Sequence, residues 1–124
     1  MLDNFHNKKI GRLGEKMAAK YLKRQGYKII AKNYNTHYGE IDIIATKNNC
    51  VAFIEVKTRT SLRYGYPEQA IHPWKLQHFQ NAVQSYISQN EKPLAGKEIS
   101  LDAVSVEYDP NTNDAKITHL ENIS

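Results

Sequence analysis

Two short polar segments, each set in an otherwise apolar stretch, have the residue types of a divalent-metal site. The first is Gly39-Glu40-Ile41-Asp42 and the second is Glu55-Val56-Lys57. Proteins typically hold Mg²⁺ with one or two carboxylates, and water and substrate phosphate complete its coordination. A lysine beside such a site can orient an attacking water, help to deprotonate it, or offset charge on a phosphate. The two segments therefore predict a metal site for chemistry on phosphodiesters.

The turn between the two segments predicts how they meet. Asn48-Asn49 suits the central positions of a tight hairpin, because asparagine tolerates positive φ. In the resulting register Asp42 lies opposite Glu55, and Glu40 lies opposite Lys57. Side chains alternate along a strand, so we expect these four polar side chains on one face. The apolar side chains expected on the other face are Ile41, Ile43, Ile54 and Val56.

Two carboxylates placed opposite each other need an explanation. They repel by roughly 0.2–1 kcal/mol when exposed, and a divalent cation would turn that repulsion into attraction. The alternative is a solvated strand face, on which Glu40–Lys57 and Asp42–Arg59 are ordinary cross-strand or diagonal salt bridges. The hairpin register, the flanking apolar residues and the nearby basic residues favour the metal site.

Hydrophobic periodicity predicts the elements that position these segments. Apolar residues recur at helical spacing in two stretches and at strand spacing in five. Gly26 suits the C-terminal cap of the first helix, and Pro73 suits the first turn of the second. This order predicts one α/β domain over residues 1–124, with a mixed sheet flanked by helices. The expected helices are 6–25 and 73–89, and the expected strands are 27–33, 38–46, 51–58, 98–108 and 115–120.

The two polar segments, found together in this order along the chain, resemble motifs of the YraN-like family of small bacterial proteins. The resemblance is carried by residues 39–45 and 53–59, by Gly14-Glu15, by residues 66–71 with Lys75, and by residues 101–106. That family is assigned to the PD-(D/E)XK nuclease superfamily and is similar to archaeal Holliday-junction resolvases. The resemblance implies a restriction-endonuclease-like core with the order α-β-β-β-α-β.

The resemblance also implies metal ligands. Asp42 and Glu55 would bind the ion, with the main-chain carbonyl of Val56 as a third ligand. Glu15, on the first helix, would complete the site, although its position alone fits a surface glutamate equally well. The superfamily often has proline before the aspartate, whereas Ile41 stands there in this sequence.

Two further residues receive roles from the resemblance. Lys57 would be the catalytic lysine. Gln69 stands where related nucleases often have a supporting polar residue. The cofactor implied for these roles is Mg²⁺ or Mn²⁺.

The distribution of basic residues suggests a nucleic-acid partner. The chain has 17 Lys and Arg against 13 Asp and Glu, a net charge of +4. Arg59, Arg63 and Lys75 follow the polar segments and are expected to contact phosphates. A ridge on the first helix is either a second phosphate contact or a solvated face. Its members are Lys9, Arg12, Lys16, Lys20 and Lys23.

Several aromatic and imidazole groups lie in expected loops or at strand edges. They either stack on unpaired bases or pack against the rim of the core, which is the commoner arrangement. They are Tyr34, His37, Tyr38, Tyr64, Tyr66 and Trp74.

These patterns lead to one expected activity and two alternatives. We expect a metal-dependent phosphodiesterase acting on DNA, with branched or flapped DNA as the first substrate to test. The alternatives are a non-catalytic nucleic-acid-binding module working with a partner enzyme, and a domain for protein interaction. Resolvase-like relatives imply a homodimer. A single cysteine, Cys50, and the lack of an apolar leader or membrane span predict a cytoplasmic protein.

Overall fold

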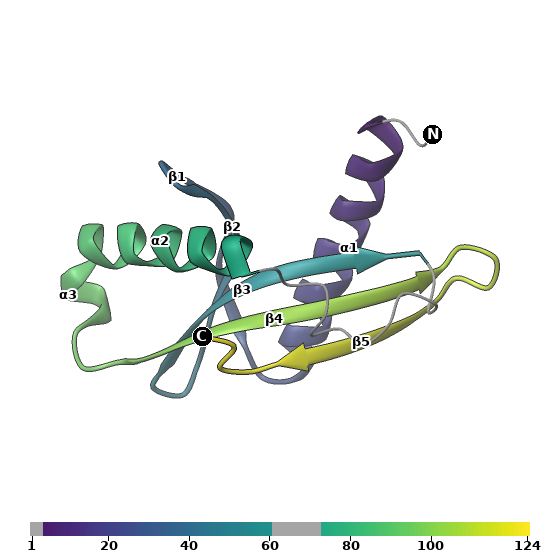
Figure 1. Cartoon of the computed structure of the whole chain (residues 1–124). Helices are drawn as coiled ribbons and strands as arrows, with labels where there is room; N and C mark the ends of the chain where they lie inside the picture. Colours follow the sequence, from purple (N-terminus) through teal and green to yellow (C-terminus); the bar gives the residue numbers. More distant parts are fainter. Residues whose placement is uncertain (1–3, 61–72) are drawn as a thin grey trace.

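The computed structural model describes residues 4–60 and 73–124 (Figure 1). The predicted helices and strands are all present, and a short helix, α3, follows the second long helix. The α-β-β-β-α-β order expected of a restriction-endonuclease-like core is therefore confirmed. The elements are α1 (Asn4–Arg24), β1 (Lys28–Thr36), β2 (Gly39–Lys47), β3 (Cys50–Arg59), α2 (Pro73–Gln89), α3 (Glu91–Leu94), β4 (Glu98–Asp109) and β5 (Asp114–Leu120).

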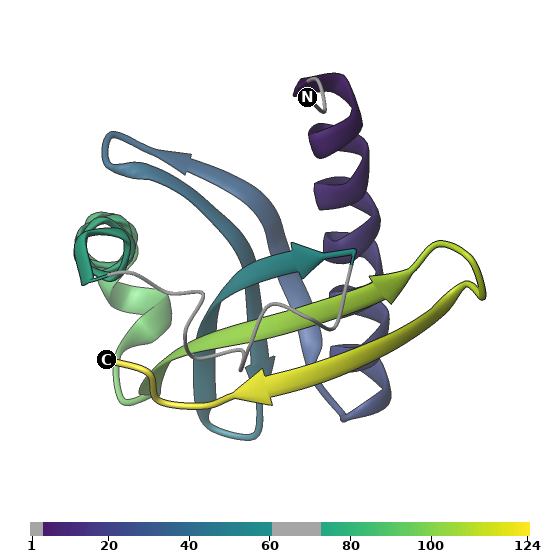
Figure 2. The ribbon, with the colours of Figure 1, turned by 45° about the vertical axis from the view of Figure 1, so that its right-hand side comes forward.

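The five strands form one mixed sheet in the order β1-β2-β3-β4-β5. Strands β3 and β4 are parallel, and the other neighbouring pairs are antiparallel. A parallel pair needs a crossover connection, and the chain that makes it includes α2. Helices α1 and α2 lie on opposite sides of the sheet, as Figure 2 shows.

Each helix covers its own apolar cluster. The cluster under α1 consists of Ala18, Ala19, Leu22, Ile43, Ala45, Ala52, Ile54, Val104 and Val106. The cluster under α2 consists of Ile41, Ile44, Val51, Phe53, Phe79, Ala82 and Val83. Burying both faces explains the apolar run at the start of β3, from Cys50 to Ile54, as in other strands covered on both sides.

Local signals end α1 and form the hairpin turn where they were predicted. Gly26 has a φ of +97°, which glycine adopts without steric cost. The N–H of Tyr27 donates to the carbonyl of Leu22 at 3.0 Å, as in a Schellman cap. Asn48 has a φ of +55° in the turn after β2, and Lys47 pairs with Cys50 as expected.

The alternation expected along β2 is broken at one point. Ile41 packs in the cluster under α2, whereas Ile43 packs in the cluster under α1. The prediction that these two side chains share a face is therefore wrong. On the neighbouring strand Asn33 has a φ of +51°, and the register skips the pair Asn33–Asp42. A residue in the left-handed region turns the strand, so regular two-residue alternation is lost there.

In the part of the chain that the structure describes, no helix is both long and apolar enough to cross a membrane.

Candidate metal and nucleic-acid site

The two polar segments meet where the sheet divides. The β2–β3 register runs from Lys47 and Cys50 to its last pair, Ile43 and Ile54. Strand β3 continues beside β4 as far as Arg59, while β2 continues beside β1 alone. The β1–β2 hairpin therefore curves away from the other strands (Figure 2). Asp42 and Glu55 are the first residues beyond the last pair, so they stand at the base of this fork.

At the fork, the Asp42 carboxylate accepts a hydrogen bond from the backbone of β3. The N–H of Val56 donates to Asp42 Oδ2 at 2.8 Å. The pKa of Asp42 is raised to about 7, mainly by burial and then by the charges of Glu15, Glu55 and Glu40, although this hydrogen bond lowers it. Asp42 is thus a carboxyl group whose ionisation is opposed by burial and by three acidic neighbours. The carbonyl of Val56 as a metal ligand stays a prediction.

Two more carboxylates approach Asp42 through one asparagine. The side-chain amide of Asn33 donates to Glu15 Oε1 at 2.8 Å and to Glu40 Oε1 at 3.0 Å. Carboxylate oxygens of Glu15, Glu40 and Asp42 all lie within 4.8 Å of one another. Such a set of oxygen donors suits a hard cation such as Mg²⁺ or Mn²⁺. The residues present therefore fit the predicted metal.

Gly14 explains how Glu15 on α1 reaches the strands. A Cβ atom built on Gly14 would lie 1.8 Å from Thr58 Oγ1, so only glycine lets α1 approach β3 this closely. Gly11, one turn earlier, has no atom within 4 Å of the corresponding position. The close contact at Gly14 places the next residue, Glu15, beside Asn33.

Glu55 has a different partner. Its Oε1 lies 3.2 Å from the Nζ of Lys75 on α2, in a salt bridge that is mostly shielded on the Glu55 side. Among the described residues, the group of carboxylates within 4.8 Å does not include Glu55. The metal ligands expected from the sequence are therefore only partly brought together. Glu15 and Asp42 lie close to each other, whereas Glu55 forms a salt bridge with Lys75.

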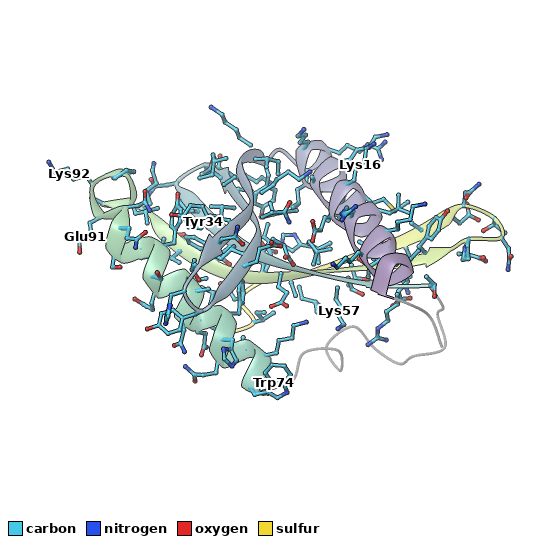
Figure 3. The ribbon with its side chains drawn as sticks, turned by 90° about the horizontal axis from the view of Figure 1, so that it is seen from above. Lys16, Tyr34, Lys57, Trp74, Glu91 and Lys92 are labelled. Carbon is cyan, nitrogen blue, oxygen red and sulfur yellow. The ribbon has the colours of Figure 1, made fainter. Side chains whose placement is uncertain are left out.

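Lys57 follows Glu55 on β3 and lies near Lys75. Burial, followed by the positive charge of Lys75, lowers the pKa of Lys57. Figure 3 shows Lys57 between α1 and the end of α2 at which Trp74 lies. The expected pairing of Glu40 with Lys57 is wrong, because the β2–β3 ladder ends before these residues and Glu40 bonds to Asn33 instead.

The other predicted contacts divide into three groups. Arg63 and Gln69, with Tyr64 and Tyr66, lie outside the described residues. Arg12, Lys16 and Lys20 are exposed on α1, and Arg59 is partly buried. Among the aromatic candidates, Tyr34 stacks edge-on against Tyr86 and belongs to the cluster under α2, whereas Tyr38 and Trp74 are exposed.

A separate polar network, not anticipated from the sequence, closes the C-terminal segment. The carboxylate of Asp102, only 1% exposed, accepts from Ser100 Oγ and from the N–H of Asn122, and its Oδ2 lies 2.7 Å from His119 Nε2. Burial would raise the pKa of Asp102, but the hydrogen bonds from His119 and Ser100 outweigh it and lower that pKa. Asp102 lies in the buried middle of β4, and nothing in its spacing indicated these partners.

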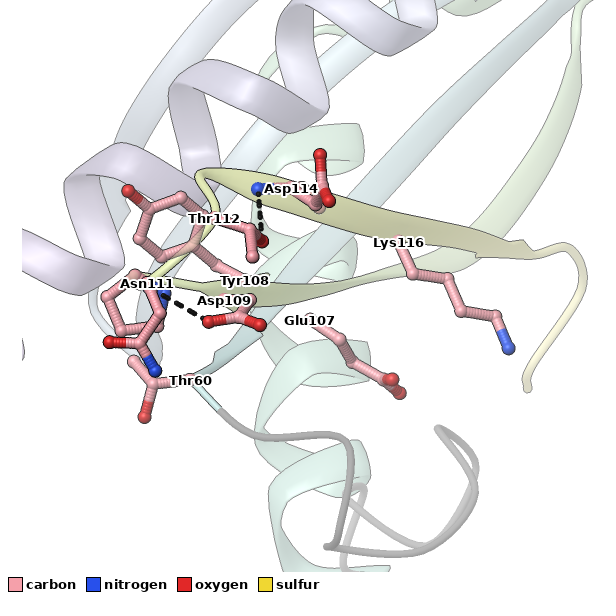
Figure 4. A pocket seen from close by; sticks show the side chains of 10 residues that line it. Thr60, Glu107, Tyr108, Asp109, Asn111, Thr112, Asp114 and Lys116 are labelled. Carbon is pink, nitrogen blue, oxygen red and sulfur yellow. Dashed lines mark hydrogen bonds between the residues drawn. The ribbon is translucent and has the colours of Figure 1, made fainter.

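A hollow of about 580 Å³ lies at the β4–β5 hairpin, away from the fork (Figure 4). Two of its polar side chains serve the turn itself: Asp109 Oδ1 accepts from the N–H of Asn111, and Thr112 Oγ1 accepts from the N–H of Asp114. These bonds are ordinary Asx and threonine turn contacts. Although this hollow is large, the fork remains the better candidate for the functional site.

The comparisons with known proteins give the family. Residues 14–106 match the model of the family described as "Uncharacterised protein family UPF0102". A UPF0102 protein of Syntrophomonas wolfei is 40% identical over 116 residues, which cover 94% of this chain and 97% of that protein. One of Caldanaerobacter subterraneus is 46% identical over 83 residues, covering 67% of this chain and 68% of that protein. The expected YraN-like membership is confirmed, and the chain belongs to the UPF0102 family.

Proposed function

We propose that this protein is a metal-dependent phosphodiesterase that cuts DNA, with branched or flapped DNA as its substrate and Mg²⁺ or Mn²⁺ as its cofactor. One observation carries the proposal. Carboxylates of Glu15, Glu40 and Asp42 converge within 4.8 Å, and the pKa of Asp42 is raised to about 7. Such a cluster of mutually repelling groups is unfavourable for the fold alone, and perturbed carboxylates of this kind gather at functional sites.

In this proposal Asp42, Glu15 and Glu40 hold the cation. Glu55 joins them from β3 when Lys75 releases it. A divalent cation bound there would supply positive charge that polarises the scissile phosphodiester. Asn33 keeps Glu15 and Glu40 in place through its two hydrogen bonds, of 2.8 and 3.0 Å. The N–H of Val56 orients Asp42 in the same way, at 2.8 Å.

Lys57 acts on the attacking water. Its lowered pKa increases the fraction of neutral amine near neutral pH, and a neutral amine can accept a proton from water. Lys75 lies near enough for its charge to act on Lys57, and the same charge attracts the phosphate. The fork thus presents both carboxylates and lysine side chains, as a site for both a cation and a phosphodiester requires.

The test is cleavage of labelled DNA in Mg²⁺ and in Mn²⁺. Four-way junctions, flaps, single strands and blunt duplexes would be compared for the wild type, Asp42→Asn and Lys57→Met. We expect cleavage of branched or flapped DNA and a loss of about 10²–10⁴-fold in each variant, the range typical for removing a catalytic acid or base.

Matched controls separate chemistry from folding. Asp114→Asn and Lys116→Met make the same changes on the exposed β4–β5 hairpin and should leave cleavage unchanged. The proposal fails if the wild type cuts none of these substrates, or if Asp42→Asn and Lys57→Met cut as well as their controls.

A second candidate is a non-catalytic nucleic-acid-binding module. It is favoured by the exposed basic residues Arg12, Lys16 and Lys20 on α1 and by the salt bridge that already neutralises Glu55. This candidate predicts DNA binding in EDTA that weakens steeply with salt. It also predicts binding that Asp42→Asn does not change and that a Lys16→Gln, Lys20→Gln double variant reduces.

A further inference from the structure

Two large aromatic side chains beside the fork are exposed. Trp74, in the first turn of α2, is 65% exposed, and Tyr38, between β1 and β2, is 48% exposed. Tyr34 and Tyr86, by contrast, pack edge-on with ring centroids 4.9 Å apart and belong to the cluster under α2. The fold therefore packs Tyr34 and Tyr86 against the core and leaves Trp74 and Tyr38 facing solvent.

Local contacts hold both exposed rings. The ring of His78, one turn along α2, meets Trp74 edge-on with centroids 5.8 Å apart. The ring of His37 meets Tyr38 in the same way, at 5.3 Å. The turn that carries Tyr38 is closed by Thr36, whose Oγ1 accepts from the N–H of Tyr38 at 3.1 Å and donates to the carbonyl of Gly39 at 2.7 Å. The rings are thus positioned without being buried.

Trp74 and Tyr38, which are far apart in sequence, line one hollow. It has a volume of about 200 Å³ and also contains Glu55 and Lys75 of the proposed site. Phe79 and Ala82 of α2 give it an apolar wall, and Glu40 is another of its acidic residues. Pockets for drug-sized ligands are larger, about 300–1,000 Å³. The hollow therefore suits a single flat ring system, and its carboxylates disfavour an anion.

We propose that Trp74 and Tyr38 stack on an unpaired base of the DNA strand whose phosphodiester lies at the fork. A base inside a duplex is already stacked on both faces and must first be unstacked and unpaired, so a single-stranded, flapped or frayed nucleotide enters the hollow at a lower cost. Lys75, which would receive the adjoining phosphate, lines the same hollow, and its charge acts on the neighbouring Lys57. The inference rests on the proposed function and specifies its substrate class as DNA with unpaired nucleotides.

Trp74 is the only tryptophan in the chain, so its fluorescence reports directly on this contact. The experiment titrates the whole protein, in EDTA, with a short oligothymidylate and with a blunt hairpin duplex. We expect the oligothymidylate to quench the fluorescence and to bind more tightly than the duplex. Binding by Trp74→Ala and Tyr38→Ala is followed by anisotropy of labelled DNA. Each variant should bind the single strand about 5- to 150-fold more weakly than the wild type, the usual effect of removing a stacking ring. The affinity of each variant for the duplex should be unchanged.

Two further variants make the result specific. Trp74→Phe retains an aromatic face and should keep most of the affinity. Ile30→Ala removes an exposed apolar side chain, 44% exposed on β1, and should change nothing. The inference is overturned if the duplex binds and quenches as well as the single strand, or if Trp74→Ala binds the single strand like the wild type.

Because this assay needs neither metal nor cleavage, its outcome is separable from that of the proposed activity. Weaker single-strand binding by Trp74→Ala, together with a wild type that cuts nothing, would support base stacking and refute the nuclease. Cleavage that proceeds equally well on blunt duplexes, with unchanged binding by Trp74→Ala, would refute base stacking and support the nuclease.

Discussion

Replacing Asp42 with asparagine should stabilise the metal-free protein, and the gain should grow as pH rises. Burial, with the charges of Glu15, Glu55 and Glu40, raises the pKa of Asp42 from 3.8 to about 7. Each unit by which the pKa in the folded protein differs from that in the unfolded chain changes the free energy of unfolding by about 1.4 kcal/mol. The ionised carboxylate therefore costs at most about 4 kcal/mol at high pH, which is a large share of a typical domain's stability.

The sign follows from proton linkage. The folded protein holds a proton on Asp42 up to about pH 7, whereas the unfolded chain releases it near the ordinary value of about 4. The stabilising contribution of protonated Asp42 is therefore fully present below the ordinary pKa of about 4. It is lost as pH rises through the folded-state pKa of about 7. Asparagine does not ionise, and its side-chain oxygen can still accept from the N–H of Val56. The advantage of Asp42→Asn should therefore widen by about 3 kcal/mol between about pH 5 and about pH 8.5.

The assay is urea denaturation in EDTA at those two pH values, for the wild type, Asp42→Asn and Asp114→Asn. Asp114 is exposed on the far hairpin, so its variant reports the effect of removing a negative charge anywhere on the surface. An advantage of Asp42→Asn that is equal at both pH values, or no larger than that of Asp114→Asn, would refute the electrostatic reasoning about the fork.

Three further predictions follow from the same contacts. Mg²⁺ at about 100 times its dissociation constant should raise the free energy of unfolding by about 2.7 kcal/mol in the wild type and much less in Asp42→Asn; equal shifts in thermal denaturation would exclude Asp42 as a ligand. Gly14→Ala should destabilise by about 1–3 kcal/mol, because its Cβ would meet Thr58. Gly11→Ala, on the same helix with open space around it, should stabilise by up to about 1 kcal/mol; similar urea midpoints for the two would contradict this packing. His119→Ala should cost about 3 kcal/mol at neutral pH, because the carboxylate of Asp102 is buried and loses a partner. The hydrogen bonds to Asp102 lower its pKa, so the stability that they provide is present above about pH 4 and lost in acid. The destabilisation by His119→Ala should therefore shrink in acid. A destabilisation that is the same at every pH in urea titrations would contradict this reasoning.

The positions of the elements follow from local signals that act over a few residues. Apolar spacing indicates α1 and α2, Gly26 ends α1, and the asparagines before Cys50 form the hairpin turn. The turn alone determines the β2–β3 register, since one tight turn sets every later pair. The sequence thus indicated that the strands of Asp42 and Glu55 are neighbours, and the observed register follows the predicted one as far as Ile43 and Ile54, one pair short of these two carboxylates.

Only the tertiary structure decided how the site is assembled. The ladder stops at Ile43 and Ile54 because the β1–β2 hairpin turns away, and this depends on the backbone at Asn33 and on packing against two different helices. The partners of the charged groups depend on how closely each helix docks. Gly14 brings Glu15 to Asn33, and α2 brings Lys75 to Glu55. Local sequence signals act along the chain, whereas these contacts join residues that meet only after the helices pack on the sheet, so their pairing could not be deduced from spacing.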